Sequence, residues 1–246
     1  MSRPFLLIQL SDPHIGASWN GDDPAGNLAA ALDGVLALRA SPDAVLVTGD
    51  LADHAADEEY EQLRELLKRI DAPAYVLPGN HDDRTAMRAA FPLEGDGEYR
   101  YVTDVGGVRL VVCDSTVPGR PEGRLDVAWL EAQLDAPQVV VAMHHPPFDG
   151  GMPAVDEIAM GAHDSAALAA LLRRNPQVLR VLCGHTHRAA FAVVGGCGAF
   201  TAPGVHLTAR LEIGAPGYEV VAEPPAFALH VLVGGSVTTH VQPIER

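Results

Sequence analysis

The stretch Ala74-Tyr75-Val76-Leu77-Pro78-Gly79-Asn80-His81-Asp82-Asp83 joins a short apolar run to a polar turn. Residues 74–77 predict a buried strand, and Pro78 and Gly79 end it in a tight turn. An amide, an imidazole and two carboxylates follow in succession, and all three groups are ligands for divalent cations. By itself this segment favours a Gly-Asn turn with a helix cap at Asp82 or Asp83. The metal interpretation prevails because the same construction recurs elsewhere in the chain.

Four other apolar runs end in polar residues of the same kinds. The runs are residues 5–10, 44–48, 138–143 and 178–183, and the residues that follow them are Asp12, His14, Asp50, His144, His145, His185 and His187. Asp12 and His14 are two positions apart, so on an extended backbone their side chains point the same way. Gly49 allows a sharp turn before Asp50. Because open α/β sheets place their sites at the carboxyl ends of strands, we expect the five strand ends to meet.

The segments between these strands alternate with them in character. Helical periodicity covers about residues 24–39, 57–70, 125–134 and 163–174, residues 84–98 have no regular pattern, and residues 99–103 and 108–113 form a predicted hairpin. After residue 190 only short apolar runs occur, at 192–194, 218–221, 227–233 and 237–241. Gly195-Gly196-Cys197-Gly198 is a glycine-rich turn rather than a nucleotide loop, because no helix follows it. This order predicts an α/β (α+β) fold of two packed sheets flanked by helices, with β-α-β units supplying most of one sheet.

Length and charge restrict the classes of function. The 246 residues contain no linker, low-complexity tract or fixed-period repeat, which predicts a single domain over residues 1–246. The formal net charge of −15 argues against binding to nucleic acid or to an anionic membrane, since no basic patch could drive it. A locally cationic metal site could still bind an anionic substrate. The sequence is also compatible with a homo-oligomer.

Cysteine use and hydropathy indicate a cytoplasmic protein. Cys113, Cys183 and Cys197 are odd in number and lie in or beside apolar runs, as reduced core thiols do. The apolar run 5–10 is interrupted by Gln9 and is too short for the core of a signal peptide. No segment has the apolar length needed to span a bilayer.

The side chains at the strand ends predict a dinuclear metal site. A catalytic zinc site needs three protein ligands, whereas at least seven candidates are present here, enough for two ions about 3.5–4 Å apart. The many imidazoles disfavour calcium and fit manganese, iron, zinc or cobalt.

The chain resembles the calcineurin-like metallophosphoesterases over roughly residues 5–205. The resemblance is carried by an ordered set of motifs: Asp12-x-His14, Gly49-Asp50, Gly79-Asn80-His81-Asp82, His144-His145-Pro146-Pro147 and Gly184-His185-Thr186-His187. Within that family the chain is most similar to the bacterial class III cyclic-nucleotide and glycerophosphodiester phosphodiesterases. The resemblance implies a four-layer α-β-β-α sandwich with two mixed β-sheets flanked by helices.

The resemblance also implies a role for each candidate residue. Asp12, His14 and His187 would hold one ion, Asn80, His144 and His185 the second, and Asp50 would bridge the two. His145 is the second choice after His144 for the ligand from the His-His-Pro-Pro motif. A hydroxide shared by the ions would attack phosphorus in line. Asn80 and His81 would contact the substrate, and His81 would also protonate the departing alkoxide.

Other polar residues are weighed separately. His206 lies on a late turn that the resemblance places near the pocket, and it is a candidate for substrate contact. His54, His163, His230 and His240 are expected to be surface or strand residues without a chemical role. Asp53 and Asp82 are expected to support the ligands or to cap turns. Substrate choice is expected to depend on the loops at 16–26, 84–98, 148–162 and 204–218.

The leading hypothesis is a dinuclear phosphodiesterase that acts on small phosphodiesters, such as a 3′,5′-cyclic nucleotide (cAMP) or a glycerophosphodiester. The motifs contain no Arg or Lys, and the nearest are Arg84 and Arg188, so no clamp for a monoester dianion is evident. One alternative is a phosphomonoesterase or pyrophosphohydrolase at the same site; action on nucleic-acid ends is disfavoured by the acidic charge. A metal-free binding scaffold is the other alternative, but such a protein should have lost ligands, and every expected position is filled.

Overall fold

The first sheet is built around the apolar run at the amino end of the chain. In the computed structural model, which describes residues 3–19, 23–221 and 223–244, the strand order of this sheet is β13 (Ser236–Pro243), β12 (Ala226–Val233), β1 (Phe5–Leu10), β2 (Ala44–Thr48) and β3 (Ala74–Leu77). Strands β1, β2 and β3 are parallel, and β12 runs antiparallel to β1 and to β13. The sheet is therefore mixed.

The second sheet has the order β4 (Tyr101–Val105), β5 (Val108–Val112), β6 (Val139–Ala142), β7 (Val178–Cys183), β9 (Cys197–Thr201) and β8 (Ala190–Val194). Strands β5, β6, β7 and β9 are parallel, and the two edge strands β4 and β8 are antiparallel to their neighbours. A separate ribbon pairs β10 (Thr208–Ala209) with β11 (Val220–Val221).

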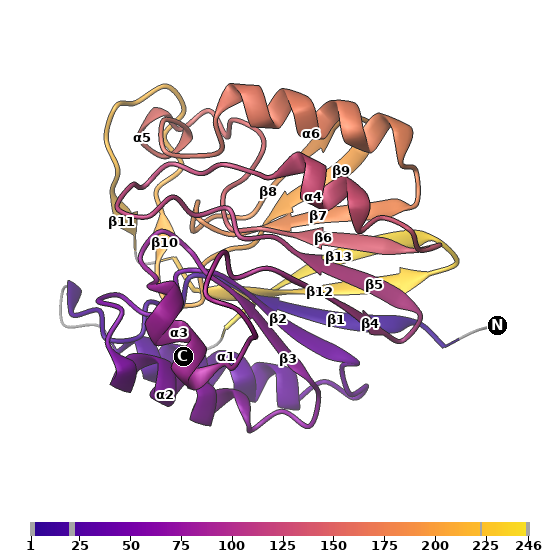
Figure 1. The fold of residues 1–246 in the computed structure, drawn as a ribbon. Coiled ribbons are helices and arrows are strands. Elements are labelled where there is room, and N and C mark those ends of the chain that lie inside the picture. Colours follow the sequence, from indigo (N-terminus) through magenta and orange to yellow (C-terminus); the bar gives the residue numbers. More distant parts are fainter. Residues whose placement is uncertain (1–2, 20–22, 222, 245–246) are drawn as a thin grey trace.

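Helices cover the outer faces of both sheets (Figure 1). On the side of the first sheet lie α1 (Pro24–Leu36), α2 (Asp57–Leu67) and α3 (Arg84–Ala90). On the side of the second sheet lie α4 (Val127–Ala132), α5 (Pro153–Asp156) and α6 (Ala162–Arg174). None of the helices in the described part of the chain is long and apolar enough to cross a membrane.

Three apolar layers hold the sandwich together. Ile8 and Leu63 belong to the layer between the first sheet and its helices. Leu7 and Val140 belong to the layer between the two sheets, and Leu168 to the layer between the second sheet and α6. Successive residues of a strand point to opposite faces, so β1 needs apolar residues on both sides. This explains its nearly continuous apolar run, and the predicted four-layer sandwich is confirmed.

Most predicted elements are confirmed, and several boundaries and segments are corrected. The helix expected at 24–39 ends at Leu36, and residues 84–98 contain α3, for which Asp83 supplies the cap by accepting hydrogen bonds from Thr85 N and Ala86 N. β-α-β units supply most of the first sheet, as predicted, and they also occur in the second sheet. The glycine-rich turn is shorter than expected, because β9 begins at Cys197 and pairs between β7 and β8.

Candidate active site and metal centre

The predicted metal ligands, their alternative His145 and the predicted general acid His81 lie at the carboxyl ends of five strands from both sheets. Those that follow β1, β2 and β3 of the first sheet are Asp12, His14, Asp50, Asn80 and His81. Those that follow β6 and β7 of the second sheet are His144, His145, His185 and His187. The centre is therefore divided between the two sheets.

Glycines let these strand ends approach one another. A Cβ added at Gly49 would lie 2.3 Å from His144 Nδ1, and one at Gly79 would lie 2.2 Å from Asp50 Oδ1. At Gly184 the added atom would meet Ser11 Oγ at 2.3 Å. Gly49 also has a φ of 88°, as expected for a sharp turn. The approach of the strands thus depends on residues that carry no side chain.

The backbone at the predicted ligands is strained. Only six residues other than glycine have positive φ in the described part of the chain, and five of them are predicted ligands: Asp12, His14, Asp50, His185 and His187. The expectation that Asp12 and His14 project from an extended backbone is therefore wrong, because their φ angles are 52° and 43°. Such strain persists where surrounding structure enforces it, and it is typical of functional sites.

One cluster contains Asp12, His14, Asp50 and His187, whose nearest ligand atoms all lie within 4.8 Å of one another. His14 Nε2 lies 3.1 Å from His187 Nε2 and 3.4 Å from Asp50 Oδ2. His14 Nδ1 lies 3.0 Å from Asp53 Oδ1, so Nδ1 carries the proton and the lone pair of the neutral ring is on Nε2. When the rings are neutral, as metal binding requires, acceptor atoms therefore face one another in the middle of this cluster.

A second cluster gathers around His144. Its Nδ1 donates to Thr48 O at 2.9 Å, so Nε2 faces Asn80 Oδ1 at 3.2 Å and Asp50 Oδ2 at 3.5 Å. His185 Nδ1 lies 3.1 Å from the same Asn80 oxygen. Asp50 thus adjoins both clusters.

His145 is positioned differently from His144. Its Nε2 donates to Pro121 O at 2.9 Å and its Nδ1 lies 2.9 Å from Ser115 Oγ, so both ring nitrogens are engaged. Burial and the adjacent His144 charge lower the pKa of His145 to about 3, which keeps the ring neutral. These contacts favour His144 over His145 as the ligand.

The centre concentrates charge in a buried place. Burial opposes ionisation of Asp50, but the adjacent His144 and His14 hold its pKa well below the usual range. Burial lowers the pKa of His144, but Asp50 and Asp12 raise it to about 9, and the pKa of His14 is also raised, so binding of a metal ion would release a proton from each ring. Burial raises the pKa of Asp12 to about 6 in spite of His144 nearby. Burial and neighbouring imidazoles hold the pKa values of His185 and His187 well below the usual range, and neutral imidazole is the form that binds metal.

Two buried polar atoms, one in each cluster, test whether the clusters fit cations. Within the described residues, Asp12 Oδ2 and His185 Nε2 are buried without a hydrogen-bond partner. Buried polar atoms are normally paired, and buried carboxylates are normally neutralised or bound to metal. Facing acceptors, unpaired buried atoms and an imidazole-rich donor set all fit transition-metal ions.

Residues around the clusters brace them. Asp82 accepts hydrogen bonds from Gly79 N, Leu51 N and Ala52 N at 2.8, 3.0 and 3.1 Å, and so joins the loop after β3 to the loop after β2. Asp53 contacts His14, as described above, and lies 3.5 Å from His81 Nδ1. These contacts are of the supporting kind expected for both aspartates.

The clusters open into a cavity of about 260 Å³. Its floor is formed by His14, Asp50, Asn80, His185 and His187, and its wall by Trp19, Ala154, Val155, Ile158 and Tyr218; His81 lies between them. The wall comes from three of the four loops expected to select substrate, and none of its residues comes from 84–98. Residues 20–22 of the first loop lie outside the described residues.

Sequence reasoning missed the individual residues of the pocket wall. Tyr218 places its hydroxyl 3.2 Å from His187 Nδ1, and the Trp19 ring lies 5.1 Å from the His14 ring. The available signal was an aromatic side chain inside a loop predicted to cover the metals. His81 remains at the rim, with its side chain 35% exposed and its Nδ1 3.3 Å from Asp53 O.

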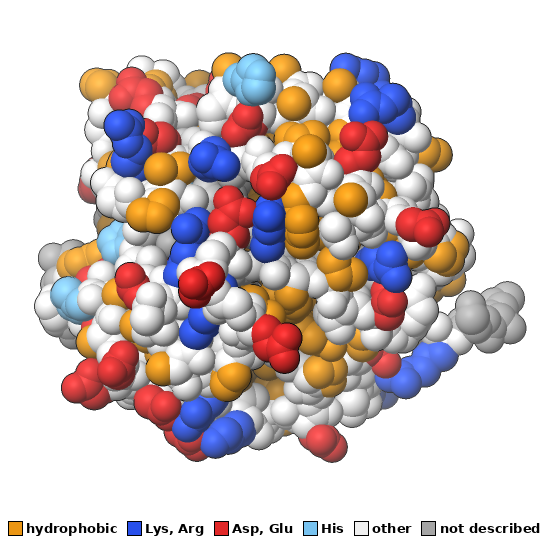
Figure 2. All heavy atoms as spheres, in the orientation of Figure 1, with side chains coloured by type: hydrophobic (Ala, Val, Ile, Leu, Met, Phe, Trp, Pro, Cys, Tyr) orange, Lys and Arg blue, Asp and Glu red, His pale blue; other side chains and the backbone are white. Residues whose placement is uncertain are grey.

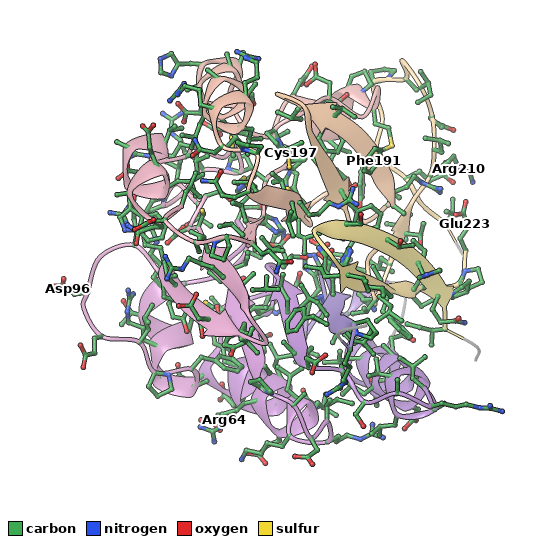
Figure 3. All side chains as sticks on the ribbon, turned by 90° about the vertical axis from the view of Figure 1, so that its right-hand side faces the viewer. Arg64, Asp96, Phe191, Cys197, Arg210 and Glu223 are labelled. Carbon is green, nitrogen blue, oxygen red and sulfur yellow. The ribbon has the colours of Figure 1, made fainter. Side chains whose placement is uncertain are left out.

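His206 and the two nearest arginines lie away from the cavity lining. His206 is buried, with Nδ1 3.1 Å from Asn27 Nδ2, and its ring is 6.2 Å from that of Trp19. Arg84 Nε donates to Asp114 at 2.6 Å. Arg188 donates to Glu223, which lies near the outline of the molecule in Figure 3.

The histidines expected to have no chemical role differ in location and burial. His163 is exposed, His240 lies on β13, and His54 is an exposed side chain 2.9 Å from Glu59. His230 is on a strand, as expected, but it is fully buried between the two sheets.

The fold and the side chains together indicate a metal-binding site at the strand ends of a four-layer sandwich. Comparison with known proteins identifies the family to which a chain of this class belongs. Residues 5–189 match the family described as calcineurin-like phosphoesterase. The chain belongs to the calcineurin-like phosphoesterase family. It is therefore a member of a family of metal-dependent hydrolases, as the motifs implied.

Relatives in sequence carry phosphodiesterase names. The chain is 30% identical to a probable glycerophosphodiester phosphodiesterase GpdQ of Arcobacter nitrofigilis, over 98% of this chain and 94% of the relative. It is 34% identical to the glycerophosphodiester phosphodiesterase GpdQ of Enterobacter lignolyticus, over 94% and 88%. It is 33% identical to the 3′,5′-cyclic adenosine monophosphate phosphodiesterase CpdA of Pseudomonas aeruginosa, over 74% and 70%.

Solved structures share the fold at much lower identity. A dimetal phosphatase from Danio rerio superposes with a TM-score of 0.68 at 18% identity, covering 99% of this chain and all of that one. A purple acid phosphatase from yellow lupin seeds gives 0.74 at 15% identity, over 99% of this chain and 52% of that one. At such low identity, these similarities show a shared fold only.

Proposed function

We propose that this protein is a phosphodiesterase that hydrolyses small phosphodiesters with two divalent ions. Asp12, His14 and His187 would hold one ion, Asn80, His144 and His185 the other, and Asp50 would serve both. Manganese, iron, zinc or cobalt fit this donor set. When bound, the ions would supply Lewis acidity toward the phosphoryl group and toward the water that attacks it. A single domain, a cytoplasmic location and a homo-oligomer stay predictions.

The observation that carries this proposal is the charge balance of the cavity. Among the described residues that line it, none is Lys or Arg. A monoester dianion has an additional charge that a bidentate arginine usually meets, whereas a diester has one negative charge. Arg84 is paired with Asp114 and Arg188 with Glu223, and neither arginine lines the cavity, so neither is placed to act as that clamp. The cavity therefore favours a diester.

His81 would serve the leaving group. It lines the cavity, and its Nδ1 faces the carbonyl and carboxylate oxygens of Asp53 at 3.3 and 3.5 Å. With Nδ1 directed at Asp53, the nitrogen of the protonated ring that can donate to substrate is Nε2. A proton delivered there to the departing alkoxide would make the leaving group neutral.

The wall favours a substrate with a planar group. Trp19 and Tyr218 are aromatic, and Ala154, Val155 and Ile158 are apolar, so the wall can cover the face of a base or an aryl ring. A glycerol headgroup would gain less from these side chains. Among the diesters named for the relatives, we infer a preference for a 3′,5′-cyclic nucleotide. On the face drawn in Figure 2, Lys and Arg are interspersed with Asp and Glu, an arrangement that does not favour binding of a nucleic acid there.

The test is a comparison of kcat/KM for bis(p-nitrophenyl) phosphate and p-nitrophenyl phosphate under one metal condition. We expect a clear preference for the diester. A preference for the monoester would instead establish the phosphomonoesterase alternative. Purified protein that binds no manganese, iron, zinc or cobalt and hydrolyses neither substrate would identify a metal-free scaffold. A second comparison, of cAMP with a glycerophosphodiester, tests the preference inferred from the wall.

A further inference from the structure

A polar side chain interrupts the apolar layer between the two sheets. Gln9 lies on β1 and is fully buried. Alternate residues of a strand point to the same face, so Gln9 points into the same layer as Phe5 and Leu7. The layer is otherwise lined there by residues such as Leu46 and Leu182. Burial of an amide costs free energy unless the amide is hydrogen-bonded, so Gln9 must have partners within this layer.

All hydrogen-bonding groups of the Gln9 amide are engaged. Nε2 donates to Cys183 O at 2.8 Å and to Thr48 Oγ1 at 3.0 Å, and Oε1 accepts from His230 Nε2 at 3.0 Å. A carbonyl can only accept, so the contact with Cys183 fixes which end of the amide carries the hydrogens. His230 Nδ1 in turn lies 2.8 Å from Thr239 Oγ1, which holds the ring from β13.

These partners end strands in different sheets. Thr48 is the last residue of β2, two positions before Asp50, and Cys183 is the last residue of β7, two positions before His185. Strand β2 belongs to the first sheet and β7 to the second. Gln9 therefore links the two sheets at the points where the chain turns into the candidate metal centre. Close beside it, His185 N donates to Asp12 Oδ1 at 3.0 Å, again from one sheet to the other.

Apolar packing alone would leave this alignment loosely defined. The hydrophobic effect is non-directional, whereas a hydrogen bond constrains both distance and angle. Each of the two clusters takes ligands from both sheets, so a small sliding of one sheet over the other would move ligands apart in both. Functional groups must be held within about 0.5 Å of their productive geometry.

We infer that Gln9, held by His230, is a positioning residue that aligns the two halves of the candidate metal centre. The inference rests on the proposed function only in its consequence for metal binding. The alignment itself concerns the strand ends of the metal-free chain. Its test therefore has one arm without metal and one arm with metal.

The metal-free arm measures hydrogen exchange of backbone amides in residues 183–187. Gln9→Leu removes both donors and the acceptor and puts an apolar side chain of comparable size in their place. We expect faster exchange at His185 N, whose bond to Asp12 crosses between the sheets. The matched control is Gln177→Leu, which removes a glutamine that bonds to Leu134 O and Asn175 Oδ1 at the opposite end of β7. The control should leave exchange at residues 183–187 unchanged.

The metal arm measures binding of Mn²⁺ by calorimetry and the magnetic coupling of the bound pair by electron paramagnetic resonance. We expect Gln9→Leu to weaken Mn²⁺ binding on the order of ten- to a hundred-fold, the range found for groups that orient ligands. The coupling should also change, which loss of folded protein alone would not produce. Gln177→Leu should keep both properties of the original protein.

The outcomes separate this inference from the proposed function. If folded Gln9→Leu exchanges at His185 N as slowly as the original protein, the inference is overturned. If Gln9→Leu does not fold, His230→Leu, which frees Oε1 without touching the strand ends, carries the same two measurements, and unchanged exchange again overturns it. If the original protein binds no Mn²⁺, Fe²⁺, Zn²⁺ or Co²⁺, the proposed function fails, while the metal-free arm still decides the role of Gln9.

Discussion

The floor and the wall of the cavity are built in opposite ways. The floor residues Asp50, His185 and His187 are buried, follow central strands and have positive φ angles. The wall residues Trp19 and Tyr218 are 36% and 48% exposed and lie in long connections. A rigid, strained floor suits chemistry that needs fixed ligand geometry, whereas an exposed apolar wall suits selection among substrates. Substitutions in the floor should therefore affect all substrates, and those in the wall only some.

The largest effect should come from Asp50→Ala. Asp50 adjoins both clusters, so its loss should abolish activity on every substrate and lower the number of ions bound. The measurements are metal content by elemental analysis and kcat/KM on bis(p-nitrophenyl) phosphate. Asp96→Ala, which changes an exposed aspartate visible in Figure 3, is the control and should change neither. Two bound ions and normal turnover in folded Asp50→Ala would show that Asp50 does not bridge.

His81→Ala should keep both ions and lose on the order of a hundred- to ten-thousand-fold in kcat on substrates with poor leaving groups, because a general acid is missing. A p-nitrophenolate needs little protonation, so aryl diesters should lose least. The measurement is kcat on cAMP and on bis(p-nitrophenyl) phosphate, with His163→Ala, whose side chain is 95% exposed, as control. An equal loss on the two substrates would remove the acid role.

Gly79→Ala tests whether the floor depends on close approach of the strand ends. The added Cβ would lie 2.2 Å from Asp50 Oδ1 and 2.3 Å from Asp50 N, so Asp50 must move. We expect metal affinity to fall on the order of ten- to a hundred-fold, as when a ligand loses its orientation. Calorimetry with Mn²⁺ measures it. Gly97→Ala is the matched control, since its Cβ meets nothing within 4 Å, and an equal effect of the two substitutions would contradict the close-packed floor.

Trp19→Ala should have the smallest and most selective effect. Loss of one stacking face costs about 1–3 kcal/mol for a nucleobase. Because Trp19 is partly exposed, we expect the lower part of this range, a fall in kcat/KM on cAMP of roughly five- to ten-fold. A glycerophosphodiester should be affected much less, and metal content should not change. Phe191→Ala is the control, because Phe191 is also an exposed aromatic residue but is not part of the cavity lining (Figure 3). A similar loss on both substrates would show that Trp19 supports the metal centre and does not select the substrate.

Much of the fold could be predicted because strong periodic signals coincide with burial. Strands β1, β2, β3 and β7 have the predicted boundaries, since each is an apolar run ended by Gly, Pro or Asp within three residues. The missed strand β9 reads Cys-Gly-Ala-Phe-Thr, which has little strand signal of its own. It becomes a strand because its neighbours β7 and β8 offer hydrogen-bond partners on both sides. Helix α3 itself was not predicted, although a helix cap at Asp82 or Asp83 was considered and Asp83 is its cap.

By itself the sequence determined which side chains end the strands, because motif order and spacing are local properties of the chain. It therefore predicted a candidate ligand set and a family. Only the tertiary structure decided how these side chains meet: that both ring nitrogens of His145 are engaged, that Arg84 and Arg188 are committed elsewhere, and that Trp19 and Tyr218 form the wall. It also decided that Gln9, an interruption in an apolar run, joins two sheets. These properties depend on contacts between residues far apart in the chain, up to 221 positions for Gln9 and His230, and no local pattern encodes such contacts.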